Sequence, residues 1–363
     1  MKKALSLGLL ILLLGSISLF ADDAKVMPAR LGRFYLAPTY AFGPGVYDWT
    51  NPSTGKKESG YHSYDDDEGA LKSAFNLGFA LEYGIIDWIT GAIQWAPGVT
   101  IASDVDAAVG TSDVNANGLA DIFVGGKIQI IGENAPVKSS QLRFAVGPGV
   151  KIPLPGPDFK EQAKNATKGD DVTASNGDYH VLGAGARLYF DYLINKNFFI
   201  DLYSEFLFYP IKQDLEESGF KEYKTLEGYK ASFANADAEV SYGYDLTFEL
   251  EPAFTTTISP AKPIIFTAGL PINYKYTPGK SYSVSGIPVP AYATAFEKAL
   301  DAIGGDPTQI LTLKPNVSFF FLSWPLPTEF KLSYSVPVWG ENLMAKHSIT
   351  LQVKAYFRVG SAK

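Results

Sequence analysis

The chain of 363 residues contains no cysteine, which excludes a disulfide framework and a lipid anchor attached to a cysteine. Beyond residue 20 it has no run of about eighteen consecutive apolar residues, so no later segment qualifies as a membrane-spanning helix. It has only 3 histidines, none in a local hydrolase motif, and we therefore expect no enzymatic activity. The net charge of −7 disfavours nucleic acid as a partner.

The N-terminus carries the features of an export signal. Two lysines precede an apolar run from Leu5 to Phe20, and Ala21 is followed by two acidic residues. This order of basic, apolar and small residues predicts a secretory signal peptide over residues 1–21. The alternative is a retained membrane anchor, for which the run is short. We expect residues 22–363 to form a single domain.

Apolar and polar residues alternate along much of the chain. From Phe198 to Pro210, one face of the segment is apolar apart from Ser204, and the opposite face includes Asp201 and Glu205. A period of two is that of a strand with one apolar and one polar side. In a bilayer, strands pair all their backbone groups only when they close into a barrel. Aromatic residues make up 14% of the chain, which suits the interfacial girdles of such barrels.

The pattern therefore predicts an all-β fold, a transmembrane antiparallel up-and-down β-barrel of about twelve strands. A soluble β-sandwich is the alternative architecture. Fourteen strands is the alternative count, with further strands inside Val99–Ala107 and Phe220–Ala234. The expected strands lie near Leu31–Phe42, Ser73–Gly84, Asp87–Ala96, Asp121–Ile131, Gln141–Pro153, Tyr179–Ile194, Phe198–Pro210, Val240–Pro252, Ile264–Tyr276, Ile310–Leu322, Glu329–Val338 and His347–Val359.

Long and short connections alternate between these strands until the last hairpin, Trp339–Lys346. Bacterial outer-membrane barrels have long external loops and short periplasmic turns, so we expect that location and the lipid bilayer as a partner. The last strand alternates and carries Phe357 near its end, which resembles the signal read by the barrel-assembly machinery. Within one long loop, Tyr292–Ile303 predicts a short amphipathic helix, either a lid or a packed loop element.

The less apolar face of each strand is expected to line the lumen. The charged residues on these faces form a basic, then an acidic, then a second basic sector around the wall. Opposed charged walls create a transverse field that orients polar solutes. The alternative is structural, because a narrow barrel can fill with side chains that pair and close the lumen. The candidates are Lys127, Arg143, Lys151, Arg187, Asp191, Asp201, Glu205, Asp245, Glu249, Glu251, Lys275, Lys314, Lys331, Lys354 and Arg358.

One loop matches the start of a calcium-binding loop. Asp113, Asn115, Asn117 and Asp121 stand at positions 1, 3, 5 and 9 of a D-x-N-x-N-G pattern, whose oxygens suit a hard cation. Position 12 is Val124 rather than the bidentate Glu of an EF-hand. The alternative is a polar turn that leads into a strand. We expect no other cofactor.

Two neighbouring segments carry a family resemblance. The segment from Gly118 through Asp121 to Lys127, followed by Gly147-Pro-Gly149-Val-Lys-Ile-Pro153, resembles a pattern of outer-membrane barrels grouped with the meta-pathway phenol-degradation proteins. Those barrels are similar to FadL-like channels. The resemblance implies uptake of small, often apolar, molecules. Ala120 stands where the pattern has glycine.

The expected function is that of an outer-membrane channel for passive uptake of small solutes, with hydrophobic compounds as the candidates that the resemblance adds. The alternative is a structural or surface-binding barrel, similar to an adhesin, that displays long external loops. A plugged lumen without conductance would favour that alternative.

Overall fold

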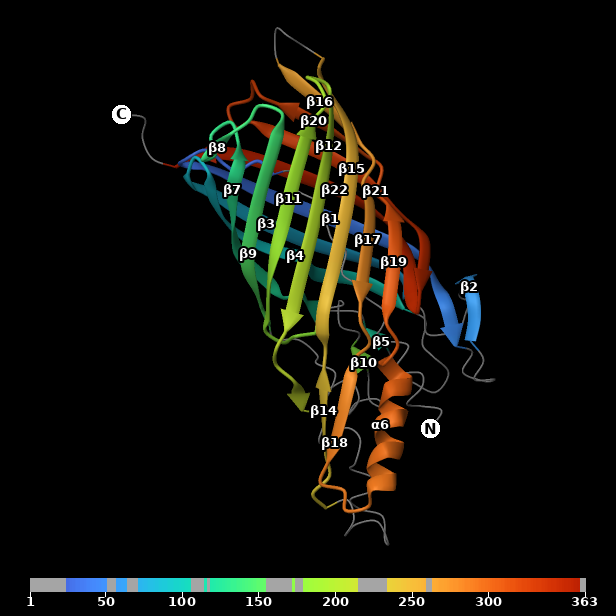
Figure 1. Ribbon diagram of the computed structural model, residues 1–363. Coiled ribbons are helices and arrows are strands. Elements are labelled where there is room, and N and C mark those ends of the chain that lie inside the picture. The colour runs from blue at the N-terminus through green and yellow to red at the C-terminus, as the bar shows by residue number, and fades with distance from the viewer. Residues whose placement is uncertain are drawn as a thin grey trace.

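A computed structural model describes residues 24–50, 57–63, 71–105, 114–115, 118–154, 172–173, 179–214, 234–258 and 263–359. Within these residues the chain forms a closed antiparallel β-barrel of 12 strands, seen from the side in Figure 1. The predicted fold class and strand count are confirmed. No helix in the described part of the chain is long and apolar enough to cross a membrane.

The strands follow one another around the wall in chain order, and the last pairs with the first. Two of the twelve are each built from two consecutive pieces. In order, the wall strands are β1 (Leu31–Thr50), β3 (Leu71–Ile86), β4 (Ile89–Val105), β7 (Ile122–Gly132), β9 (Leu142–Ile152), β11 (Gly183–Leu193), β12 (Phe198–Tyr209), β15 (Gly243–Thr257), β16 with β17 (Ile264–Gly269, Ile272–Thr277), β19 with β20 (Thr308–Leu313, Asn316–Phe321), β21 (Thr328–Glu341) and β22 (Leu343–Arg358).

Several strands run further than the sequence pattern predicts. The strand expected to end at Phe42 continues to Thr50, and the strand expected to end at Ala96 continues to Val105. The extended part of β1 pairs with β22 as far as Tyr47 and also with the short strand β2 (Lys57–Ser63). The C-terminal ends of β1 and β4 are therefore set by backbone pairing with neighbouring strands, beyond the residues that alternate between apolar and polar.

Prolines interrupt two neighbouring strands without opening the wall. Pro271 separates β16 from β17, and Pro315 separates β19 from β20. Proline has no backbone N–H and cannot donate to a ladder. Its carbonyl can still accept, and the Lys314 N–H donates to the Pro271 carbonyl at 2.9 Å. The Tyr334 N–H donates to the Pro315 carbonyl at 3.0 Å in the same way.

The two faces of the wall differ as the alternation predicts. On β12, Leu202, Phe206 and Phe208 are exposed on the outside, whereas Tyr203 and Leu207 are buried on the inside. Short links join the strands at one end of the barrel, such as the link between Ile86 and Ile89. Following the rule for outer-membrane barrels, we refer to this end as periplasmic and to the opposite end as external.

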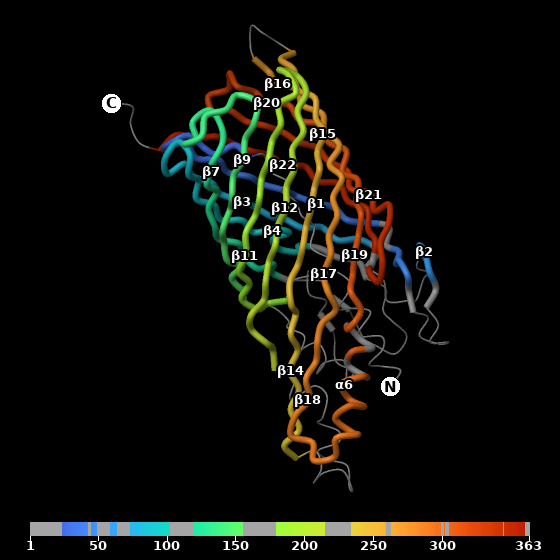
Figure 2. The backbone as a smooth tube through the Cα atoms, in the orientation of Figure 1, coloured from blue at the N-terminus to red at the C-terminus, as the bar shows by residue number. Residues whose placement is uncertain are grey.

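A small sheet and a helix stand on the external end (Figures 1 and 2). The sheet contains β13 (Gln213–Asp214), β14 (Asp237–Ser241) and β18 (Ser281–Ser285), and the helix α6 spans Pro290–Gly304. The expected amphipathic helix is confirmed, and it begins two residues earlier than Tyr292 because proline suits the first helical turn. We call these elements the external subdomain. Minor strands elsewhere are β5 (Val114–Asn115), β6 (Gly118–Leu119), β8 (Val137–Lys138) and β10 (Val172–Thr173).

An apolar core joins the external subdomain to the barrel mouth. From the barrel come Phe123 and Leu207, and from the subdomain come Val240 and Tyr282, all buried. The helix contributes Phe296, which packs against the same cluster. Apolar side chains thus gather at the external end of the barrel, and we call this core the apolar mouth cluster.

Glycines allow a ring to lie flat on the inner wall. A Cβ atom at Gly149 of β9 would overlap the Phe123 ring, and one at Gly125 of β7 would come within 2.8 Å of it. Only glycine leaves this space next to the backbone. The glycine-rich segment that carries the family resemblance therefore serves close packing inside the barrel.

Candidate functional site

The segment before the first strand lies inside the barrel near its periplasmic end. The Ala24 N–H donates to Oδ1 of Asp191 at 2.7 Å, and the Gln129 side-chain amide donates to the Ala24 carbonyl at 2.9 Å. Further along, the Met27 N–H donates to Oγ1 of Thr90 at 2.8 Å. Ala24 is fully buried, and Met27 is nearly so. We call residues 24–30 the N-terminal segment.

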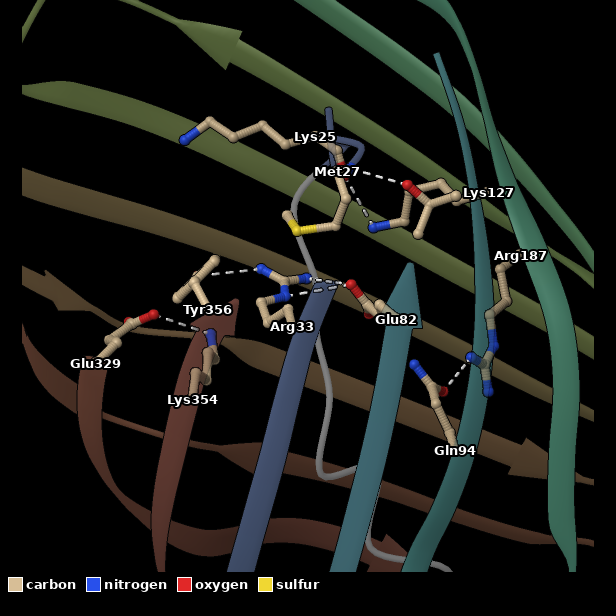
Figure 3. A network of polar contacts seen from close by, with 11 residues as sticks. Lys25, Met27, Arg33, Glu82, Gln94, Lys127, Arg187, Glu329, Lys354 and Tyr356 are labelled. Atoms are coloured by element: carbon tan, nitrogen blue, oxygen red, sulfur yellow. Dashed lines mark hydrogen bonds and ion pairs between the residues drawn. The ribbon is translucent and has the colours of Figure 1, made fainter. Parts of the chain in front are cut away.

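The segment follows the inner wall from β1 past β3, β4 and β7 as far as β11. Near β1, the Arg30 N–H donates to the Gly84 carbonyl of β3 at 2.9 Å. A Cβ at Gly84 would overlap the Pro28 carbonyl, so glycine lets the segment press against the wall. Lys127 of β7 donates to the Lys25 carbonyl at 3.4 Å, as Figure 3 shows. The segment therefore covers one half of the periplasmic end of the lumen.

A polar network lies on the external side of the N-terminal segment, where the first and last strands meet (Figure 3). The Arg33 guanidinium of β1 donates to Oε2 of Glu82 on β3 at 2.7 Å, and both side chains are about 95% buried, with 6% and 4% exposed. Arg33 also donates to the Tyr356 hydroxyl at 3.4 Å. On the other side of the seam, Lys354 of β22 lies 3.4 Å from Glu329 of β21. These contacts hold the closing strands together.

A second network spans the middle of the lumen. Arg187 of β11 forms an ion pair with Glu205 on β12 and donates to the Gln94 side chain of β4. Its guanidinium carbon lies 3.6 Å from the centroid of the Phe123 ring. Because β4 and β12 are far apart around the wall, this arginine bridges the lumen rather than lying along its wall.

The acidic sector on β15 contacts the second basic sector. Lys314 lies 3.3 Å from Glu249, and Lys275 lies 3.8 Å from Asp245. Asp245 also accepts a hydrogen bond from the Thr277 hydroxyl at 2.8 Å. The segregated charges of the sequence therefore meet as pairs between β15 and the two wall strands that follow it.

The remaining candidates of the first basic and acidic sectors also face inward. Arg143 lies 3.5 Å from Asp191, and the Lys127 ammonium lies 4.1 Å from the Tyr189 ring centroid. Asp201 stands between Asp191 and Glu251 in the strand register. Lys151 is half-buried on β9, whereas Arg358 is exposed at the periplasmic end of β22.

Four charged or amide-bearing members of these networks escaped the sequence analysis, and one of them is Glu329, at the start of the eleventh predicted strand. Arg33 and Glu82 stand on the polar faces of the first two predicted strands, and Gln94 stands on the third. Extending the same alternation to these strands would have found them. The N-terminal segment has no periodic pattern, so no comparable signal pointed to it.

The predicted calcium loop is described only in part. Asp113 and Asn117 lie outside the described residues, and Asn115 belongs to β5, which pairs with β10. Oδ1 of Asp121 accepts the Leu154 N–H at 3.1 Å and lies 3.1 Å from Nδ1 of His180. Within the described part of the chain, no group of three or more metal-ligating side chains is placed to hold an ion.

Lys280 gives the external subdomain a predicted pH dependence. Burial lowers the pKa of Lys280 to about 8, and its ammonium lies 5.6 Å from the Tyr242 ring centroid. Between pH 8 and the ordinary lysine pKa, the unfolded chain binds more protons, so stability rises with pH, by at most about 1.4 kcal/mol per unit. Limited proteolysis between pH 7 and pH 10 is expected to show increasing protection of the subdomain. Lys280→Met should remove that trend; an unchanged trend would assign it to another group.

Comparison with solved structures places the fold. An outer membrane channel from Pseudomonas putida F1 is 10% identical, with a TM-score of 0.56, and the match covers 94% of this chain and 100% of that one. The NanC porin is 9% identical, with a TM-score of 0.37 and coverage of 89% and 98%. A mutant of the TodX monoaromatic hydrocarbon channel is 8% identical, with a TM-score of 0.37 and coverage of 92% and 91%.

No protein-family model and no curated protein matches the sequence. The structural likeness to the Pseudomonas putida channel extends over nearly the whole chain. The resemblance expected from the glycine-rich segment is confirmed at the level of fold: the chain is a 12-strand β-barrel with the fold of that outer membrane channel.

Proposed function

We propose that this protein is an outer-membrane channel for passive uptake of small solutes, including apolar ones, and that the N-terminal segment gates it. The observation that carries the proposal is a short segment held inside a charged lumen by hydrogen bonds and by the packing of Ala24 against Ala145, Tyr189 and Tyr203. The proposal assigns no catalysis to the chain. It takes residues 1–21 as an export signal and the alternating last strand as the feature read by the barrel-assembly machinery.

The contacts of the N-terminal segment suit a displaceable gate. Each of its hydrogen bonds contributes about 0.5–1.5 kcal/mol, and the partners are Asp191, Gln129, Thr90, Gly84, Lys127 and Asp87. Their sum is of the order of several kcal/mol, an amount that thermal motion or solute binding can overcome on a biological timescale. The chain has no cysteine that could tie the segment covalently.

The apolar mouth cluster supports entry of apolar solutes. Buried side chains such as Tyr209, Tyr242 and Tyr282 occupy the external end of the lumen. An apolar solute that replaces one of these contacts with its own surface loses little free energy, whereas a hydrated ion must shed water there. Polar networks begin just below, at Arg187. A solute that enters from the external end therefore meets apolar side chains first and polar side chains next. This order suits solutes that have an apolar part.

Uptake by reconstituted vesicles tests the proposal. The mature chain from residue 22 onward would be refolded, inserted into phospholipid vesicles and assayed for entry of radiolabelled benzamide, a small neutral aromatic. We expect entry faster than in protein-free vesicles. Heat-modifiable gel mobility confirms insertion. Entry at the protein-free rate by a fully inserted protein would contradict a channel.

The second candidate function is a surface-binding barrel. The observation that favours it is the external subdomain, whose Ala238 and Val240 are buried in the apolar mouth cluster, against which Phe296 of α6 packs. A loop that only connects strands needs no such core. An inserted protein that remains impermeable, also after removal of the N-terminal segment, would favour this function.

A further inference from the structure

Four lumen lysines stand on four neighbouring wall strands and descend toward the periplasmic end. On the descending strand formed by β19 and β20, Ile310 pairs with Lys275, and Lys314 follows four residues later. Another four residues on, Ser318 pairs with Lys331 of β21. The four are Lys275 on β17, Lys314 between β19 and β20, Lys331 on β21 and Lys354 on β22.

The last step continues the descent. Gln352 of β22 pairs with Lys331, and Lys354 follows two residues later on a strand that also runs toward the periplasmic end. The N-terminal segment makes its hydrogen bonds to β3, β4, β7 and β11, on the other half of the wall. We call the four residues the lysine ladder. It runs down the half of the lumen opposite those anchors.

At Lys314 and Lys331, in the middle of the ladder, water reaches the lysine more readily than its acidic partner, whereas Lys354 and its partner Glu329 are similarly exposed, at 13% and 15%. The Lys314 side chain is 13% exposed and its partner Glu249 only 2%. Lys331 is 19% exposed and its partner Glu251 10%. An accessible surface inside a closed barrel faces the lumen, so the ammonium groups rather than the carboxylates of these pairs meet a solute there.

Neutral donors hold the same carboxylates. The Asn273 side-chain amide donates to Glu249 at 2.9 Å, and the Asn316 side-chain amide donates to Glu251 at 2.9 Å. The lysines lie further away, at 3.3 Å for Glu249 and 3.8 Å for Glu251. A close charge-assisted bond would measure about 2.7–2.9 Å. The acids are therefore anchored by amides, and the lysines contact them loosely.

We propose that the lysine ladder is the solute path and that the solutes are small organic anions, each with one carboxylate and an apolar body. The inference rests on the proposed channel function and names its substrate class. The carboxylate passes from one ammonium to the next, since rows of Lys or Arg line pores for anions. The apolar body suits the mouth cluster, where Phe123 and Tyr209 lie above the ladder.

Paired solutes and paired variants test the ladder. Benzoate and benzamide have the same ring and nearly the same size, and only benzoate is charged at pH 8. The uptake rate of each labelled solute would be measured in vesicles that contain the protein, potassium and valinomycin. The rate in protein-free vesicles would be subtracted. The variant Lys314→Gln/Lys331→Gln removes two charges, Lys314→Arg/Lys331→Arg keeps them, and Lys212→Gln removes one outside the lumen.

We expect the wild-type protein and the Lys→Arg and Lys212→Gln variants to prefer benzoate over benzamide. Losing one charge at about 4 Å in an aqueous lumen corresponds to about a fivefold loss, so the Lys→Gln variant should lose at least that factor for benzoate alone. Should it fail to insert, Lys314→Gln/Glu249→Gln, which removes both members of a pair, takes its place.

The outcomes separate the two proposals. If neither solute enters through the inserted wild-type protein, the channel function fails, and the ladder with it. Entry of benzamide without a preference for benzoate overturns the ladder and leaves the channel standing. A preference that survives the Lys→Gln substitutions also overturns it, because the ammonium groups would then be structural only.

Discussion

Deletion of residues 24–29 is expected to raise the single-channel conductance of the refolded protein severalfold. The deleted residues lie inside the lumen against β3, β4, β7 and β11, where Ala24 and Met27 are buried. The wall does not depend on them for closure, because β1 pairs with β22 from Leu31 onward. Planar-bilayer recordings of the wild-type and deleted proteins provide the measurement.

A single substitution should weaken the gate without removing it. Thr90→Val keeps the shape of the side chain but removes the acceptor for the Met27 N–H. The loss of one hydrogen bond, about 1 kcal/mol, corresponds to about a fivefold rise in the open probability. Thr39→Val is the matched control, since the Thr39 hydroxyl is also buried but contacts Thr350 at 2.9 Å, away from the segment.

The deletion also has an outcome that would count against the gate. If conductance stays at the wild-type level, the lumen is closed elsewhere, and the apolar mouth cluster becomes the barrier. If Thr39→Val opens the channel as often as Thr90→Val, the effect reflects a looser wall rather than a released segment.

Much of the barrel follows from the sequence because its physical cause is local. Each strand such as β12 must present an apolar side to lipid and a more polar side to the lumen. On β12, Leu202 and Phe206 stand on the outer side, and Tyr203 and Glu205 stand on the inner side. The interruption at Pro271 was not predicted, because the alternation continues on both sides of it.

The content of the lumen was predictable only in part. The sequence indicated basic and acidic sectors, and it left open whether they face each other across a pore or pair. Pairing depends on register, such as Arg187 opposite Glu205, and on contacts across the lumen, such as Arg187 with Gln94. The position of the N-terminal segment depends on distant partners like Asp191, which no local pattern reveals.

Arg33→Ala is expected to destabilise the barrel by about 3–5 kcal/mol, the typical cost of leaving one member of a buried ion pair without its partner. Arg33 and Glu82 are nearly fully buried and are joined by two hydrogen bonds, at 2.7 Å and 3.2 Å. Removing the guanidinium leaves the carboxylate in a poorly solvated site between β1 and β3. It also removes the contact with Tyr356 of β22. Urea unfolding in detergent micelles, followed by tryptophan fluorescence, measures the change.

The double variant Arg33→Met/Glu82→Leu decides whether burial of an unpaired charge is the cause. Replacing both partners with apolar side chains of similar volume removes the charge as well as the bond, and such replacements are often neutral or stabilising. We therefore expect the double variant to unfold near the wild-type urea concentration, far above Arg33→Ala. Lys212→Ala, at an exposed ion pair with Glu239, should change stability little. If the double variant is as unstable as Arg33→Ala, the charge pair itself contributes specific attraction between β1 and β3.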